Sequence, residues 1–258
     1  MRPFSYFGLA LLLGMTLTGC VKERRGLCPC RLSLDLSRLD TSVVEIARVN
    51  VLGPGGYMYD ESVGMESFGE EVLINVPKGG CMLCVYSGEQ GFVNPDLGLS
   101  IPYGEDCPPV YMCAAFLDTE CEQYRKVVML RKSYCRLSVH VTDVEYFPFG
   151  LAVRSNVAGY GADGAPVPGE FYCGIDDFSG EDWVLSVPRQ TDDGMILEIN
   201  DGTTVLKTFA LGEYIRASGY DWNAADLEDI TVGIDYTRTK LTVSVQGWDE
   251  VYEFDVVI

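Results

Sequence analysis

Cysteine is the residue type through which this sequence is best equipped for chemistry. The chain has 10 cysteines in 258 residues, and thiols can form disulfides, bind zinc or carry a covalent modification. One follows an apolar leader, and the others are Cys28, Cys30, Cys81, Cys84, Cys107, Cys113, Cys121, Cys135 and Cys173. Export would favour disulfides for this second group, whereas the same Cys-x-Cys and Cys-x-x-Cys spacings in a cytosolic chain would favour zinc. Their odd number leaves at least one thiol free or available to another molecule.

The first twenty residues indicate the compartment. Arg2 is the only charge before an apolar run from Phe4 to Leu17. That run is too short for a membrane span of about 20 residues but suits the core of an export signal. It ends in Leu17-Thr18-Gly19-Cys20, and small residues directly before a cysteine resemble the lipobox of bacterial lipoproteins. The resemblance implies that residues 1–19 are a signal peptide, removed before Cys20; an ordinary signal peptide with a chance cysteine is the alternative.

Lipidation would make Cys20 a membrane anchor. The lipobox resemblance implies a diacylglycerol on its thiol and an acyl chain, such as palmitate, on its amine. Each buried CH₂ contributes about 0.8 kcal/mol, and more than one chain gives stable attachment. Residues 20–30 would then be a lipidated tether. Its basic residues, Lys22, Arg24 and Arg25, would lie beside phosphate headgroups, or else simply in solvent.

Catalytic and metal-binding patterns are otherwise weak. The single histidine, His140, would lie in a strand on the face of Ser138 and Thr142, without a nucleophile and orienting acid beside it, so we expect a surface residue. Acidic doublets could bind calcium or act as glycosidase carboxylates, although no EF-hand spacing is present and loop carboxylates usually face water. These doublets are Asp176-Asp177, Glu181-Asp182 and Asp192-Asp193. We therefore predict no enzymatic activity, no cofactor and no metal site.

The charge of the chain disfavours nucleic acid as a partner. The sequence has 38 acidic and 19 basic residues, a net charge of −19. Loss of residues 1–19 would remove the positive charge of Arg2 and make the net charge −20. Binding to a nucleic-acid duplex depends on basic groups that displace counterions from phosphates. Solubility is the simplest role for this acidity.

The elements that would position these residues are predicted to be β-strands. Residues 31–37 alternate polar and apolar, the period of a half-buried strand. Short segments rich in β-forming residues and bounded by Gly, Pro or Asn turns follow; they are 46–52, 71–76, 81–86, 110–116 and 124–130. If 81–86 is a strand, Cys81 and Cys84 point to opposite faces and cannot bond to each other.

The second half of the chain has the same character. Strands are predicted at 136–142, 149–154, 183–188, 195–199, 204–210, 230–236, 241–246 and 252–257, with a hairpin turn at Asn200-Asp201-Gly202. Short helices are predicted at 211–217 and at 223–227, the second capped by Asp221 or Asn223.

A short repeat suggests two related domains. Cys30-Arg31-Leu32-Ser33 recurs as Cys135-Arg136-Leu137-Ser138, and the interval is the length of one β-sandwich. A shared domain architecture is favoured over a chance match. Hydrophobic residues make up 47% of the chain, enough for two cores at about 100 to 150 residues per domain. We predict an all-β chain with domains at 31–132 and 133–258, linked near 130–134.

Both ends of the chain resemble those of the FimB/Mfa2 family of Bacteroidales fimbrial anchor subunits. The opening has the lipobox cysteine, then Cys28-Pro29-Cys30, then the strand Arg31-Leu32-Ser33-Leu34; the ending has segments 209–214, 227–236 and 241–248. The resemblance implies two tandem transthyretin-like Greek-key β-sandwiches. It also implies an outer-membrane lipoprotein, exposed at the cell surface, that anchors a fimbrial shaft, limits its length and supports adhesion. The cysteine content departs from the family pattern.

The same resemblance implies fimbrial shaft subunits as partners, joined by donated β-strands. Such a strand completes a sheet edge and an apolar groove. Our candidates for strand exchange are the alternating residues Tyr252, Phe254, Val256 and Ile258, although we favour this run as the last strand of its own domain.

The alternative function is a surface glycan-binding lipoprotein of a polysaccharide-uptake system. Aromatic residues in loop contexts could form its sugar-stacking surface, and ordinary partial burial is the simpler expectation for them. These residues are Tyr57, Tyr59, Tyr103, Tyr160, Tyr220 and Trp222.

Overall fold

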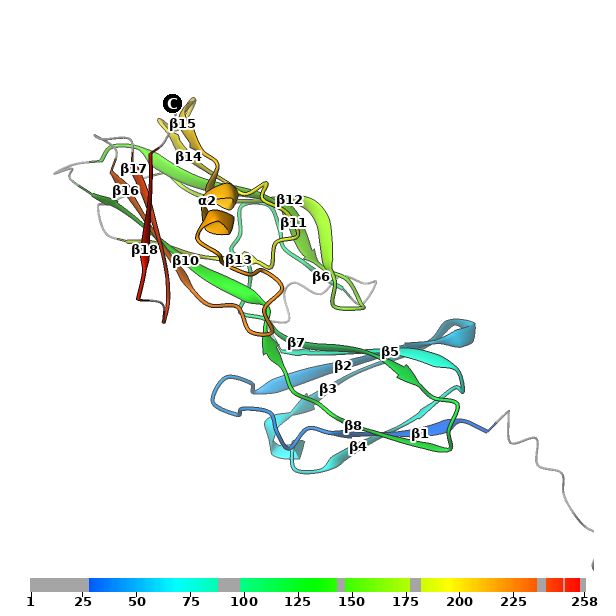
Figure 1. The fold of residues 1–258 in the computed structure, drawn as a ribbon. Helices are drawn as coiled ribbons and strands as arrows, with labels where there is room; N and C mark the ends of the chain where they lie inside the picture. Colours follow the sequence, from blue (N-terminus) through cyan, green and yellow to red (C-terminus); the bar gives the residue numbers. More distant parts are fainter. Residues whose placement is uncertain are drawn as a thin grey trace, which may run out of the picture.

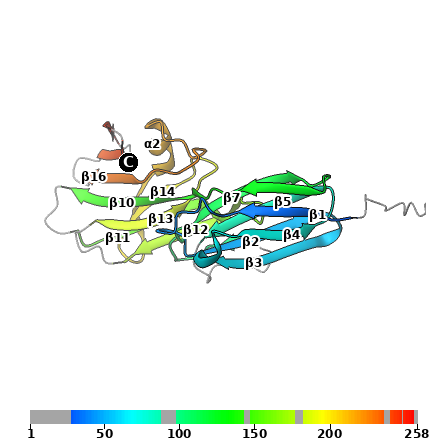
Figure 2. The ribbon, with the colours of Figure 1, turned by 90° about the horizontal axis from the view of Figure 1, so that it is seen from below.

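The chain forms two β-sandwiches placed end to end (Figures 1 and 2). The computed structural model describes residues 28–87, 98–142, 147–176, 182–235, 240–247 and 249–255. Within these ranges the structure is mostly strand, with one α-helix and two short 3-10 turns. The prediction of an all-β fold built from two sandwiches is confirmed.

The N-terminal sandwich packs a three-stranded sheet on a five-stranded one. The smaller sheet has the order β4 (Glu71–Val76), β1 (Cys30–Asp35), β8 (Gln123–Val127). The larger has the order β3 (Tyr57–Gly64), β2 (Ile46–Gly53), β5 (Gly80–Ser87), β7 (Tyr111–Asp118), β9 (Arg131–Lys132). The alternating apolar residues of β1 and β2 face each other across the core, where Leu32, Leu34, Val49 and Val51 are fully buried.

The C-terminal sandwich pairs a five-stranded sheet with a second sheet that a short strand joins. The first has the order β13 (Trp183–Pro188), β10 (Tyr134–Thr142), β16 (Ile230–Asp235), β17 (Lys240–Val245), β18 (Val251–Asp255). The second has the order β12 (Pro166–Ile175), β11 (Gly150–Tyr160), β14 (Ile196–Asn200), β15 (Val205–Phe209). Helix α2 (Leu211–Ala217) contributes Leu211 and Ile215 to the same core.

The repeated cysteine tetrapeptides occupy equivalent positions. Strand β1 lies between an antiparallel neighbour, β4, and a parallel one, β8. Strand β10 lies likewise between antiparallel β13 and parallel β16. Leu32 and Leu137, the third residues of the two repeats, are both fully buried. The repeat therefore marks the same central strand in two sandwiches.

A segment from the first half of the chain packs on the C-terminal sandwich. Strand β6 (Leu99–Ser100) pairs with β11, and the amide of Cys107 donates to the carbonyl of Ser186 at 3.0 Å. Leu99 and Val110 are buried in the C-terminal core cluster. The outer face of β5 also contributes to that cluster, through Cys84 and Tyr86. The two sandwiches are thus joined by apolar burial as well as by the linker.

The structure corrects the sequence reading at five elements. Strands β3, β6, β9 and β12 were not predicted, and the predicted helix at 223–227 is wrong. Residues in that region form a turn instead, in which the Asp221 carboxylate accepts from the amide of Asn223 at 2.8 Å, a local bond that competes with helix formation. The helix predicted at 211–217 is confirmed as α2. Among the described residues, no helix has the length and apolar character needed to cross a membrane.

Candidate partner-docking strand and the domain junction

The last described strand, β18, is the element that carries two of the predicted exchange residues. It pairs antiparallel with β17, with Tyr252 opposite Val243 and Phe254 opposite Leu241. The Phe254 ring lies 4.9 Å from that of Tyr214 on α2 and packs against the core cluster. Phe254 therefore faces the inside of its own sandwich, and Tyr252 lies half-buried on the same face of β18.

The other long side of β18 has no neighbouring strand among the described residues. The order of the sheet ends at β18, and Val251, at 68% exposure, is solvated on the face opposite Tyr252 and Phe254. An edge strand presents backbone N–H and C=O groups that another chain can pair with. Lys240 and Glu253 form an ion pair across the β17–β18 ladder. Charge at an edge is one way in which proteins limit unwanted pairing.

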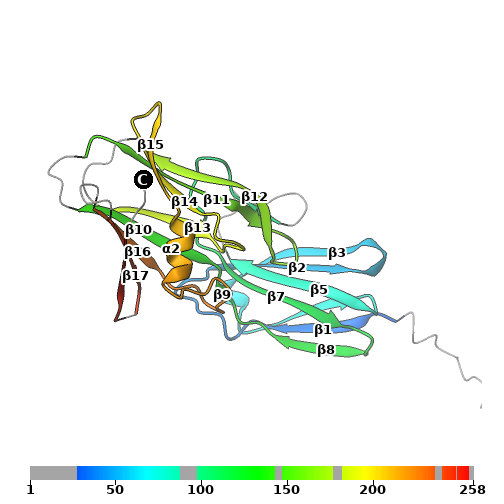
Figure 3. The same ribbon diagram turned by 45° about the horizontal axis from the view of Figure 1, so that its top comes forward.

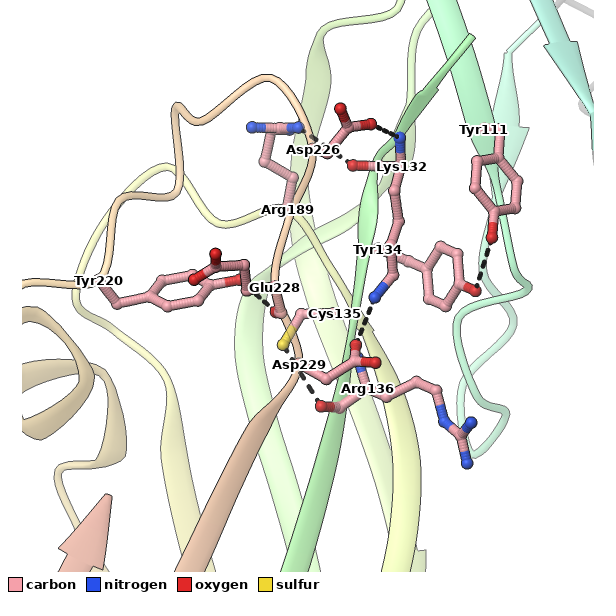
Figure 4. Close-up of polar contacts among 10 residues, drawn as sticks. All are labelled: Tyr111, Lys132, Tyr134, Cys135, Arg136, Arg189, Tyr220, Asp226, Glu228 and Asp229. Carbon is pink, nitrogen blue, oxygen red and sulfur yellow. Dashed lines mark hydrogen bonds and ion pairs between the residues drawn. The ribbon is translucent and has the colours of Figure 1, made fainter. Parts of the chain in front are cut away.

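Residues 131–136 cross between the two sandwiches and are held on both sides. The amide of Lys132 donates to the Asp226 carboxylate at 2.8 Å, and Arg131 pairs with the same carboxylate at 2.9 Å. The Lys132 ammonium pairs with Asp229, whose carboxylate also accepts from the amide of Arg136 at 2.8 Å (Figure 4). Two aspartates from the 220–229 loop therefore fix both ends of the crossing segment.

Arg189 and Tyr160 hold the crossing segment from the other side. The Arg189 guanidinium donates to the carbonyl of Lys132 at 3.5 Å and to the carbonyls of Trp222 and Ala224, the last at 2.8 Å. The Tyr160 hydroxyl donates to the carbonyl of Ser133 and accepts from the amide of Arg189 at 2.8 Å. Burial raises the pKa of the Tyr160 hydroxyl well above its usual value, so it remains a donor at physiological pH.

One pair of tyrosines and a third tyrosine, Tyr220, complete the junction. The hydroxyls of Tyr111 and Tyr134 lie 3.4 Å apart, and the Tyr220 hydroxyl donates to the carbonyl of Glu228 at 2.7 Å (Figure 4). Lys132 lies 5.0 Å from the centre of the Tyr134 ring. The linker backbone is thus hydrogen-bonded on both flanks, an arrangement that restricts its movement. Sequence reasoning missed this network, since its members are spread from 111 to 229.

The remaining predicted site residues are placed as follows. Cys20, Val256 and Ile258 lie outside the described residues, so lipidation and exchange at these positions stay predictions. His140 is half-buried on β10, opposite Gly233. In the described part of the chain no group of three or more His, Cys, Asp or Glu residues is arranged to hold a metal ion.

Among the described residues, one acidic doublet and most of the loop aromatics are engaged in the fold itself. Asp192 accepts from the Asn156 amide at 3.1 Å and Asp193 pairs with Arg216 at 2.9 Å, so this doublet stabilises the fold. Asp177 and Glu181 lie outside the described residues. Of the six aromatic residues considered for sugar stacking, Tyr160 and Tyr220 are buried and Tyr103 is the exposed one, at 62%. The expectation of partial burial fits the others, which are half-buried.

The cysteines are distributed over both cores. Cys81 faces the N-terminal core and Cys84 the C-terminal one, which confirms that their thiols point to opposite faces of β5. No disulfide joins the cysteines of the described residues. Cys30 and Cys121 approach each other most closely, with Sγ atoms 3.9 Å apart.

Comparison with solved structures identifies the fold. The fimbrial anchor protein Mfa2 from Porphyromonas gingivalis superposes with a TM-score of 0.58 at 13% identity, over 86% of this chain and 98% of that one. A proposed adhesin from Bacteroides ovatus gives 0.57 at 11% identity, over 88% and 95%. Another, from Bacteroides thetaiotaomicron, gives 0.54 at 11% identity, over 86% and 97%. No family model and no curated protein matches the sequence. The resemblance to fimbrial anchor subunits is thus confirmed for the fold.

Proposed function

We propose that this chain is a lipid-anchored subunit that seats a fimbrium at the bacterial outer membrane, limits its length and supports adhesion. The observation that carries the proposal is the placement of the two ends. The start of β1, where the tether enters, and the edge strand β18 lie at opposite ends of the molecule (Figures 1 and 2). A subunit that connects a membrane to a shaft requires this arrangement.

The membrane end rests on Cys20 and the tether behind it. Only nine residues separate Cys20 from Cys30, the first residue of β1. An extended segment of that length spans about 30 to 36 Å, since each residue contributes about 3.3 to 3.6 Å. The N-terminal sandwich would therefore be held close to the membrane surface.

The shaft end rests on the open side of β18. A strand from a shaft subunit would extend the five-stranded sheet along this side through main-chain hydrogen bonds. Its alternating apolar side chains would pack on the core face beside Tyr252 and Phe254, and their spacing would set the register. Val256 and Ile258 continue the same alternation in the sequence, beyond the described residues.

The hydrogen-bonded junction supports a role in transmitting force. A pull on the shaft would reach the membrane through residues 131–136, and Asp226, Asp229, Arg189 and Tyr160 hold this segment by hydrogen bonds and ion pairs. A flexible linker would instead let the two sandwiches swing apart. The contacts at the junction thus support the proposal of an anchor over that of two independent binding modules.

Replacing the lipidated cysteine tests the membrane end. In cells expressing Cys20→Ala, we expect the protein to leave the membrane fraction and fimbriae to appear detached in the medium. Cys28→Ala is the matched control, since it changes a thiol in the same tether and leaves the lipidation position intact. Normal attachment and length of fimbriae in the Cys20→Ala strain would refute the proposal. Saturable oligosaccharide binding by the purified protein would support the glycan-binding alternative.

A charge at the open edge tests the shaft end. We expect Val251→Lys to reduce co-purification of shaft subunits about tenfold, equivalent to roughly 1.4 kcal/mol, because a lysine on an edge strand disfavours the pairing of that strand with another chain. The control is Phe116→Lys, which places the same charge on an equally exposed residue, also 68% accessible, of the other sandwich. Equal recovery of shaft subunits with both variants would rule out docking at β18.

A further inference from the structure

Two cysteines meet where the tether enters the fold. Cys30 is the first residue of β1, and Cys121 lies in the turn between β7 and β8. Their Sγ atoms are 3.9 Å apart although the residues are 91 positions apart in sequence. Figures 1 and 3 place this turn beside the start of β1. Among the described residues this is the one pair of cysteines in contact through sulfur.

The backbone holds the pair in place. Strands β1 and β8 run parallel with Arg31 opposite Gln123, and the amide of Arg31 donates to the carbonyl of Glu122 at 2.9 Å. Arg31 directly follows Cys30 in the sequence, and Glu122 and Gln123 directly follow Cys121. The proximity of the sulfurs is therefore a consequence of strand register, rather than of two mobile side chains.

We propose that Cys30 and Cys121 are oxidised to a disulfide after export. A disulfide requires sulfurs about 2.05 Å apart, so the pair must approach by about 2 Å more. Cys121 can supply this movement, because its side chain is exposed on a turn and its thiol donates to the carbonyl of Gln123 at 3.1 Å. Cys30 is fully buried on a central strand and is the fixed partner.

The chemistry proceeds by two thiol–disulfide exchanges. The oxidant is a disulfide-form thiol oxidoreductase or a small-molecule disulfide such as oxidised glutathione. The thiolate of exposed Cys121 attacks one oxidant sulfur, which forms a mixed disulfide and releases one thiol. The sulfur of Cys30 then attacks Cys121 Sγ, which forms the internal bond and releases the second thiol. The two cysteines lose two electrons and two protons, and the oxidant disulfide gains them.

The environments of the two sulfurs fix this order. Burial, together with the hydrogen bond to Cys121, raises the pKa of the Cys30 thiol to about 11, so few Cys30 thiolates exist at neutral pH. Cys30 is also out of reach of a bulky oxidant. Initial attack therefore falls to Cys121, and Cys30 reacts only with the sulfur already beside it.

The crosslink would change how the N-terminal sandwich carries tension. A pull applied at the tether would pass from Cys30 through the bond to Cys121 and on to residues 122–136. Residues 31–120, which lie between the two cysteines, would be excluded from the path. The use of this crosslink against fimbrial drag rests on the proposed function, whereas the bond itself requires only export to an oxidising compartment.

Counting free thiols in cysteine variants tests the bond. The full-length protein is recovered from an exporting host, denatured without reductant, alkylated and weighed by mass spectrometry. We expect Cys121→Ser and Cys30→Ser each to have one more free thiol than the wild type, because each releases its partner. We expect the control Cys28→Ser to have one fewer, since it removes an unpaired thiol. The lipid thioether at Cys20 is common to all four proteins.

Each other pattern overturns the assignment. One fewer free thiol in Cys121→Ser means that Cys121 is unpaired in the wild type. A gain in Cys28→Ser together with a loss in Cys30→Ser means that Cys28 is the partner. A wild-type tryptic digest gives a second readout that does not depend on how the variants fold. It should contain peptide 26–31 joined to peptide 79–125, and reduction should separate them; finding both peptides unlinked before reduction refutes the bond. Neither measurement involves fimbriae, so its outcome is separate from that of the anchoring proposal.

Discussion

Mechanical extension of the chain should reveal the Cys30–Cys121 crosslink directly. If the protein is pulled between its N- and C-terminal ends, unfolding the N-terminal sandwich releases chain into the path of the force. With the sulfurs bonded, residues 31–120 form a closed loop that cannot lengthen. With the sulfurs reduced, the whole of that loop can extend under force when the sandwich unfolds.

The size of the effect follows from the sequence separation. The pair spans 91 positions, and an extended chain gains about 3.3 to 3.6 Å per residue. The reduced protein should therefore show an unfolding step longer by about 300 to 330 Å. In the oxidised protein the same sandwich can release only the short stretch from Cys121 to the junction, about 30 Å on the same scale.

Single-molecule force spectroscopy measures both lengths in one trace. The C-terminal sandwich contains no part of the bridge, so its unfolding step should be the same in both states and serves as an internal ruler. Cys121→Ser should give the long step with or without reductant. Cys113→Ser, a half-buried cysteine on β7, should behave as the wild type. A long N-terminal step in oxidised wild-type protein would refute the reasoning.

Two further predictions concern stability and are measured by urea denaturation. Tyr160→Phe should lower the free energy of unfolding by about 1 to 3 kcal/mol, because it leaves the carbonyl of Ser133 and the amide of Arg189 without this partner. The control Tyr103→Phe, at an exposed ring, should change the free energy of unfolding little. Equal losses in the two variants would contradict a special role for the junction. Gly159→Ala should cost about 2 kcal/mol or more, because Gly159 has φ 152° and a Cβ there would lie 2.0 Å from the carbonyl oxygen of Leu99. Gly69→Ala, where a Cβ meets nothing within 4 Å, is its control, and a neutral Gly159→Ala would mean that β6 is not held against β11 in solution.

The local pattern of the sequence was sufficient for most of the strands. Segments 71–76 and 183–188 were predicted with the bounds that the structure gives to β4 and β13. Alternation has a period of two within one strand, so it also predicted correctly that Cys81 and Cys84 face opposite ways. The repeated Cys-Arg-Leu-Ser revealed two equivalent central strands for the same reason.

Strand β12 was not predicted because its sequence contains residues that disfavour a β-strand. It contains Pro166, Pro168 and Gly169, which normally argue against a strand. Proline is nevertheless tolerated at an edge, where no ladder bond is lost on the open side, and β12 is the edge of its sheet. Whether a strand lies at an edge depends on the other strands, so this segment could not be assigned from its own residues.

The sequence by itself determined the class of fold, the tandem layout and the candidate lipid anchor, because each depends on composition or on residues adjacent in the chain. Only the tertiary structure decided that segment 98–110 packs on the second sandwich and that Arg189 and Tyr160 hold the linker. It also brought Cys30 to Cys121. These contacts join residues tens of positions apart, and their formation depends on strand register and on burial across two cores, neither of which is encoded in any single stretch of sequence.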